Sequence, residues 1–182
     1  MKSPPSLQVR PTSDRLRETL FNVIAPRIQE ARFLDLCAGS GAVGIEALSR
    51  YAAHVTFVDR SRKMFALIEA NLELCRIAKE ERQVVQMEAT DFLRQMIRQA
   101  GAPSGQEKSV PWDFVFFDPP YAEDYLPVLN ILSAHSHTLL TERGQLVVEH
   151  HHKNPLPDEL GNLRRTRVLK QGDSALSFYG VE

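Results

Sequence analysis

The stretch FLDLCAGSGAVG, residues 33–44, decides the fold. Its first five residues (33–37) form an apolar run typical of a buried strand, and residues 38–44 are a glycine-rich turn. The segment GIEALSRYA that follows has the composition of a helix. A strand, a glycine turn and a helix in direct succession form the nucleotide-binding unit of many α/β proteins. We therefore expect the ligand of this protein to lie at this turn.

The same alternation continues outward from the turn. We expect strands at 54–59, 83–87, 113–118 and 145–151, and helices at about 62–78, 90–100 and 124–134. Strand–helix alternation predicts a parallel sheet with helices on both faces. Two closing strands, at 164–171 and 175–181, are joined by the Gly172-Asp173 turn and must pair antiparallel. The prediction is a Rossmann-like α/β fold with a seven-stranded, mostly parallel sheet that contains one antiparallel strand.

The length of 182 residues predicts a single domain, 1–182. Within it we expect an extended Pro-rich arm (1–11), an N-terminal helix (12–30) and a Rossmann-like core (31–182). Thr12 or Ser13 could cap that helix, and Pro26 should end it or bend it.

Composition excludes several classes of protein. Cys37 and Cys75 are the only cysteines and both lie in apolar segments, which argues against a disulfide scaffold and a structural zinc site. The sequence has no apolar run of about 20 residues, and its N-terminal residues do not resemble a signal peptide. We therefore expect a cytoplasmic protein without a membrane partner. Residues 1–32 carry six Lys/Arg against three Asp/Glu, whereas 33–142 carry ten against fifteen. The basic N-terminal side chains could meet the phosphates of a nucleic acid, or they could form a solvated helix face.

The glycine turn fits two cofactors. Gly39, Gly41 and Gly44 form a GxGxxG pattern, and Asp59 ends the next strand, twenty residues after Gly39. This is the pattern of a dinucleotide site, in which the acid binds ribose hydroxyls. Asp35, however, lies just before the turn, where its charge would repel a pyrophosphate but suit the amino group of S-adenosylmethionine. A carboxylate at Asp35 could instead cap the turn, and one at Asp59 could cap the next helix.

An acidic residue also follows the third expected strand. Glu88 could reach the amino group of an adenine, with the Ala89 backbone N–H beside it. Glu88 could alternatively cap the following helix, and Asp91 competes with it for the adenine.

The fourth expected strand ends in Asp118-Pro119-Pro120-Tyr121. The exocyclic amine of a nucleobase is a poor nucleophile, so its methylation needs fixed hydrogen-bond acceptors, a flat surface for the base and an aligned methyl donor. Asp118 offers a carboxylate, Pro119 a backbone carbonyl on a stiff turn, and Tyr121 a ring for stacking. A dehydrogenase has no evident use for this segment, so it favours S-adenosylmethionine over a nicotinamide cofactor.

These motifs together resemble the class I methyltransferases and, most specifically, the RsmD family of bacterial 16S rRNA (guanine-N2)-methyltransferases. The resemblance rests on RPTSDRLRETLFN (10–22), FLDLCAGSGAVGIEALSRYA (33–52), VDRS (58–61), EATDFL (88–93), FVFFDPPY (114–121) and GDSALSFY (172–179). It implies S-adenosylmethionine as cofactor, S-adenosylhomocysteine as product, and 16S rRNA in an assembled or assembling 30S subunit as partner, with a monomeric enzyme. By the resemblance, the cofactor would contact Asp35, Ala38, Gly39, Ser40, Gly41, Asp59, Arg60, Glu88 and Ala89. The target guanine would contact Asp118 to Tyr121, and RNA would face Arg10, Thr12, Arg15 and Arg17.

Other interpretations stay open at this point. The Asp-Pro-Pro-Tyr segment suits adenine N6 in DNA as well as guanine N2, and the chain could be a non-catalytic RNA-binding assembly factor. His150, His151 and His152 suggest a metal, but neighbours on a strand point to opposite faces, so we expect no metal site.

Overall fold

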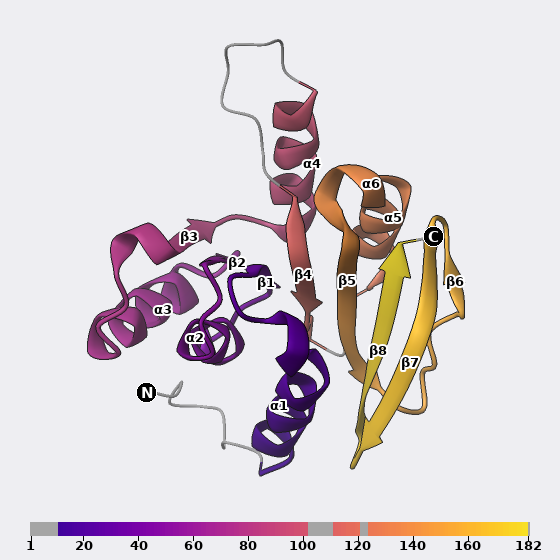
Figure 1. Cartoon of the computed structure of the whole chain (residues 1–182), viewed down its shortest axis with the longest axis horizontal. Coiled ribbons are helices and arrows are strands. Elements are labelled where there is room, and N and C mark those ends of the chain that lie inside the picture. The colour runs from indigo at the N-terminus through magenta and orange to yellow at the C-terminus, as the bar shows by residue number, and fades with distance from the viewer. Residues whose placement is uncertain (1–10, 102–110, 121–123, 182) are drawn as a thin grey trace.

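We describe a computed structural model of the chain, in which residues 11–101, 111–120 and 124–181 are described. All strands join one sheet, in the order β3-β2-β1-β4-β5-β8-β7-β6, which Figure 1 shows from β3 at the left to β6 at the right. The strands are β1 (Arg32–Leu36), β2 (His54–Asp59), β3 (Arg82–Gln86), β4 (Trp112–Phe117), β5 (Leu140–His151), β6 (Glu159–Leu160), β7 (Leu163–Gln171) and β8 (Ser174–Val181).

Strands β1 to β5 are parallel, and β8 runs antiparallel to both of its neighbours, β5 and β7. The fold class and the reversed strand β8 are thus confirmed, but β6 also runs antiparallel to β7, so the sheet has two reversed strands and not one. The prediction of seven strands was wrong by one, because the two-residue strand β6 pairs antiparallel with β7 at the sheet edge. Strand β5 also starts at Leu140 instead of residue 145, since Leu140 pairs with Trp112 ahead of a register shift.

The helices are α1 (Pro11–Ile24), α2 (Ala42–Ser49), α3 (Arg62–Leu74), α4 (Ala89–Ala100), α5 (Leu126–Ala134) and α6 (Ser136–Leu139), with short 3-10 turns η1 (Ala25–Arg27) and η2 (Lys79–Glu81). Two apolar clusters show that they cover both faces of the sheet. Side chains of α1, α2 and α3 pack with Phe33, Phe57 and Phe114 on one face. Side chains of α4, α5 and α6 pack with Leu36 and Val115 on the other face.

The N-terminal helix is shorter than expected. It begins at Pro11, so Thr12 and Ser13 lie inside its first turn, and it ends at Ile24 instead of continuing to residue 30. Pro26 lies in η1, directly after α1. Proline lacks the N–H that an α-helix needs and its ring crowds the preceding turn, so the expected break at Pro26 is confirmed.

The turn between β1 and α2 depends on two glycines for different reasons. Gly41 precedes α2 with a φ of 77°, in the left-handed region that glycine adopts without strain. Gly44 lies where α2 contacts β2: a Cβ there would lie 2.2 Å from Phe57 Cε1 and 2.8 Å from Val55 Cγ1. The absence of a side chain at Gly44 therefore lets the helix approach the sheet closely beside the turn.

No helix within the described ranges combines the length and the apolar character that crossing a bilayer requires.

Candidate functional site

A cleft of about 640 Å³ opens at the carboxyl ends of the parallel strands. All five of these strands contribute to it through residues at or just beyond their ends, as expected for the ligand site of an α/β sheet. The residues that line it include Cys37, Gly39, Asp59, Arg60, Glu88, Ala89, Asp118, Pro119, Pro120 and Glu149. The cleft therefore brings Gly39 of the glycine turn, the acids Asp59 and Glu88, and the Asp-Pro-Pro turn into one site.

The Asp59 carboxylate fixes the start of the glycine turn through hydrogen bonds. Its Oδ2 accepts a hydrogen bond from the Gly39 N–H at 3.0 Å, and its Oδ1 accepts one from the Ser61 N–H at 2.8 Å. The cap of α3 is Ser61, whose side chain accepts from the Met64 N–H, so Asp59 is not the helix cap. Each carboxylate oxygen can accept more than one hydrogen bond, so Asp59 can also bind hydroxyl groups of a ligand in the cleft.

Glu88 lines the cleft beside Arg60, with 3.5 Å between Oε1 and Nη1. Glu88 occupies the position before α4, yet its side chain makes no capping hydrogen bond. Its competitor Asp91 lies in the first turn of α4 and pairs with Arg94. Asp91 is not among the residues that line the cleft, so the geometry favours Glu88 as the acid that meets a ligand.

Asp35 is only 2% exposed, and its Oδ2 accepts a hydrogen bond from the Gly44 N–H at 3.0 Å. This bond fastens the start of α2 to β1. Burial, partly offset by this bond, raises the pKa of Asp35 to about 7, and the charge of Asp59 adds to the rise. Asp35 is absent from the cleft lining, as are Ala38, Ser40 and Gly41, and contact of these four residues with a cofactor stays a prediction.

Asn71, which no sequence motif marks, supports the same turn. This residue of α3 is fully buried, and its Nδ2 donates a hydrogen bond to the Ser40 carbonyl at 3.0 Å. A polar residue on the inner face of a predicted helix is the only signal that sequence offers for such a support. Asp35, Asp59 and Asn71 thus hold the glycine turn from three different elements.

Asp118 stands just after β4, and its N–H donates to the Leu36 carbonyl at 3.4 Å. The pKa of Asp118 is raised well above its ordinary value by burial and, secondarily, by the negative charges of Glu149 and Asp35. Pro119 is buried and Pro120 is exposed, and both line the cleft. Tyr121, the last residue of the predicted motif, lies outside the described residues.

The predicted RNA-facing residues differ in their contacts. Arg15 is exposed on α1. Arg17 instead pairs with Glu46 of α2 at 2.6 Å and with Asp14 at 2.9 Å, which joins the two helices. Arg10 and the side chain of Thr12 lie outside the described residues.

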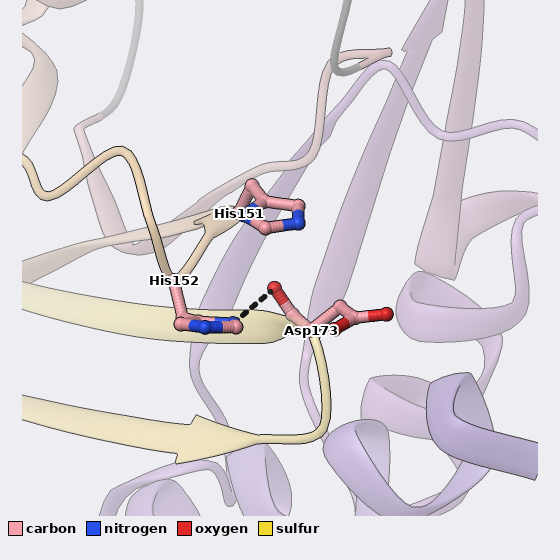
Figure 2. Close-up of side chains that lie close together, drawn as sticks. All are labelled: His151, His152 and Asp173. Atoms are coloured by element: carbon pink, nitrogen blue, oxygen red, sulfur yellow. Dashed lines mark hydrogen bonds between the residues drawn. The ribbon is translucent and has the colours of Figure 1, made fainter.

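His151, His152 and Asp173 gather beside the turn that leads into β8 (Figure 2), with one ligand-type atom of each within 4.8 Å of the others. His150 points elsewhere, to the Ser177 hydroxyl at 2.9 Å, as the alternation of a strand requires. His152 follows the end of β5, so its side chain need not point to the face opposite His151, as it would within a strand. Hydrogen bonds already engage the cluster: His151 Nδ1 accepts from the Lys153 N–H, and His152 Nδ1 contacts the Asp173 carbonyl.

Comparison with known proteins places this site in a family. Residues 1–180 match the family described as "Conserved hypothetical protein 95". The chain is also 36% identical over 180 residues to ribosomal RNA small subunit methyltransferase D of Escherichia coli (strain K12), covering 98% of this chain and 83% of that protein. The chain belongs to the RsmD family. The resemblance that the sequence motifs indicated is thereby confirmed.

Other RsmD relatives agree in sequence and fold. The Bacillus subtilis (strain 168) protein YlbH is 35% identical over 98% of this chain and 91% of its own length. A solved structure of the Escherichia coli protein yhhF superposes with a TM-score of 0.80 at 34% identity, over 100% of this chain and 91% of that one. The RsmD match therefore extends over the whole sheet and its helices.

Proposed function

We propose that this protein transfers the methyl group of S-adenosylmethionine to the exocyclic N2 amine of a guanine in small-subunit (16S) rRNA. One observation carries the proposal: the rigid Asp118-Pro119-Pro120 turn opens into the same cleft as Asp59 and Glu88. A nucleoside-binding pair of acids and an amine-binding turn thus share one cavity, as methyl transfer between two ligands requires.

The residues present fit S-adenosylmethionine. Glu88 and the Ala89 N–H would receive the adenine, and Asp59 would receive the ribose hydroxyls. The methionine end would follow the glycine turn, toward the carboxylate of Asp35. The cofactor supplies an activated methyl group on a sulfonium, so the reaction needs no metal.

Asp118 and the Pro119 carbonyl accept hydrogen bonds from the target amine and hold its lone pair in line with the methyl carbon. Bound S-adenosylmethionine would supply the methyl group that the amine nitrogen takes, and S-adenosylhomocysteine, which keeps the electrons of the broken C–S bond, would be the leaving group. The amine then loses one proton, for which the ionised Asp118 carboxylate is the adjacent acceptor.

The partner follows from the family and from the charge of the N-terminal region. We propose that the substrate is 16S rRNA within an assembled or assembling 30S subunit, and that Arg15 on the exposed side of α1 contacts its phosphates. The target guanine must leave its stack to enter the cleft. We further propose a single-domain monomer that acts in the cytoplasm.

The direct test maps modified nucleosides in rRNA from a strain that lacks the gene. One N2-methylguanine should disappear from 16S rRNA, and the purified protein should restore it on subunits from that strain. Unchanged 16S rRNA in the deletion strain, or methyl transfer to duplex DNA in place of subunits, would overturn the proposal.

We expect Asp59→Ala to weaken binding of S-adenosylhomocysteine roughly 10- to 100-fold, because hydrogen bonds to a carboxylate contribute about 1.5–3 kcal/mol. The measurement is calorimetric titration, supported by the thermal shift that a bound ligand produces. Asp91→Ala is the matched control and should retain the wild-type affinity, since Asp91 lies off the cleft. Equal losses in both variants, or thermal stabilisation by NAD instead, would contradict this assignment.

The raised pKa of Asp118 predicts the pH dependence of the reaction. Only the ionised carboxylate can accept the amine and its proton, so the methyl-transfer rate should increase as pH rises through that pKa. An ordinary aspartate is ionised throughout the range from pH 5.5 to 8.5 and would give a flat profile. Single-turnover rates at saturating cofactor measure this dependence, and a flat profile would show that ionisation of Asp118 does not limit the reaction.

A further inference from the structure

A second carboxylate lies beside Asp118 in the cleft. Phe117 of β4 pairs with Val148 of β5 in the parallel ladder, so the next residues lie side by side: Asp118 directly after β4, and Glu149 within β5. Both residues line the cleft. The negative charge of Glu149 is the second contribution to the raised pKa of Asp118, after burial. The two acids therefore present one continuous acceptor surface to whatever the cleft binds.

Glu149 is held in place from the neighbouring strand. The hydroxyl of Ser174, the first residue of β8, donates a hydrogen bond to Glu149 Oε1 at 3.0 Å. β5 and β8 are paired through seven residues up to His151 and Ser174, so this support comes from a rigid part of the sheet. A carboxylate fixed in this way can recognise a base as well as contribute charge.

Nucleobases differ in what lies next to their exocyclic amine. In guanine, the 2-amine is adjacent to the ring N1–H, so two donors stand side by side. In adenine and cytosine, the amine is adjacent to a ring nitrogen that carries a lone pair and accepts hydrogen bonds. Two neighbouring carboxylates match two neighbouring donors, whereas a carboxylate that faces a lone pair is left unpaired in a closed site.

We propose that Glu149 is the specificity-determining residue of the cleft, accepting the guanine N1–H while Asp118 accepts the 2-amine. This inference rests on the proposed function and deepens it, because it states why the cleft selects guanine over the other amine-bearing bases. The Asp-Pro-Pro-Tyr segment alone suits guanine N2 and adenine N6 alike, since it binds only the amine.

The test replaces Glu149 by glutamine and changes the base at the same time. 2-Aminopurine keeps the exocyclic 2-amine of guanine but has a lone pair at N1. Methyl transfer is measured on 30S subunits reconstituted with guanine or with 2-aminopurine at the mapped nucleotide. We expect the wild type to prefer guanine, and Glu149→Gln to shift the preference toward 2-aminopurine by about 100-fold or more, because its amide can donate to N1.

The glutamine variant also tests the charge of Glu149. Its amide retains an acceptor for Ser174, so the fold should be preserved, but it removes one of the negative charges that raise the pKa of Asp118. Asp35, the other acid that raises this pKa, stays in place. The pH profile of methyl transfer should therefore move to lower pH, which loss of structure alone would not produce.

Glu142→Gln is the matched control. Glu142 is exposed near the opposite end of β5 and should retain the wild-type preference and pH profile. An unchanged base preference in Glu149→Gln, or a wild type that methylates 2-aminopurine as well as guanine, would overturn the inference and leave the proposed function intact. A wild type that methylates no guanine in subunits would overturn both.

Discussion

Replacing Asp118 with asparagine is expected to lower the rate of methyl transfer by about two to three orders of magnitude, because a group that stabilises developing charge at a reacting atom typically contributes this much. Asparagine keeps the size of the side chain, but its amide cannot take the proton that the amine releases. Its NH2 group can also face the amine, where two donors would oppose each other. Alanine at this position removes the acceptor altogether and should abolish turnover.

The loss should appear in the chemical step and not in cofactor binding. Asp118 follows β4, whereas Asp59 ends β2 and Glu88 follows β3, and β2 and β3 lie on the other side of β1 from β4. Single-turnover rates with saturating S-adenosylmethionine measure the step, and the affinity for S-adenosylhomocysteine should stay within a few-fold of wild type. Asp91→Asn serves as the matched control, because it removes a carboxylate from an exposed site outside the cleft. If Asp118→Asn retains a rate within ten-fold of the wild type, Asp118 does not take part in the chemical step.

Replacing Gly44 with alanine is expected to destabilise the fold by about 1–3 kcal/mol or more, the usual cost of overpacking. The new Cβ would lie 2.2 Å from Phe57 Cε1 and 2.8 Å from Val55 Cγ1, so a side chain or the helix must move. Phe57 and Val55 are both fully buried in β2, which pairs with strands on both sides and cannot easily retreat. For a chain of this length, a loss of about 1–3 kcal/mol corresponds to a decrease in Tm of about 2–12 °C.

Thermal unfolding measures this effect, and Gly101→Ala is the matched control. A Cβ at Gly101 would meet nothing closer than 3.8 Å, and its φ of −84° suits alanine, so this variant should unfold at the wild-type temperature. Displacement of α2 in Gly44→Ala should also weaken binding of S-adenosylhomocysteine, because the Gly44 N–H is the donor to Asp35. Equal Tm values for the two variants would show that α2 can move away from β2 without cost.

Much of the site could be predicted because its residues follow strand ends that local patterns reveal. Apolar runs of five or six residues marked β1, β2 and β4, and parallel strands bring their carboxyl ends to one edge. Asp59, Glu88 and Asp118 were found by this rule, and the cleft brings all three together. Glu149 also follows an apolar run, but no motif marks it, and only the pairing of β5 with β4 brings it beside Asp118.

Other features depend on partners that are distant in sequence. The pairing of Arg17 with Glu46, 29 residues away, is recorded in no local pattern, and contact of Arg17 with RNA stays a prediction. In the sequence, nothing distinguishes Asn71 from other polar residues of a helix, and only the packing of α3 brings it to the Ser40 carbonyl. Strand β6 has two residues, too few to produce any pattern, and it exists because β7 offers an edge for pairing.

The sequence by itself determined the order of the strands and helices, the glycine turn and the acids at the strand ends. Short-range patterns are sufficient for these features, because backbone preferences and apolar periodicity act over a few residues. The tertiary structure alone decided which side chains share the cleft, which cations are already paired, and how Ser174 orients Glu149. These features depend on pairing between strands and helices far apart in the chain, which no local pattern records.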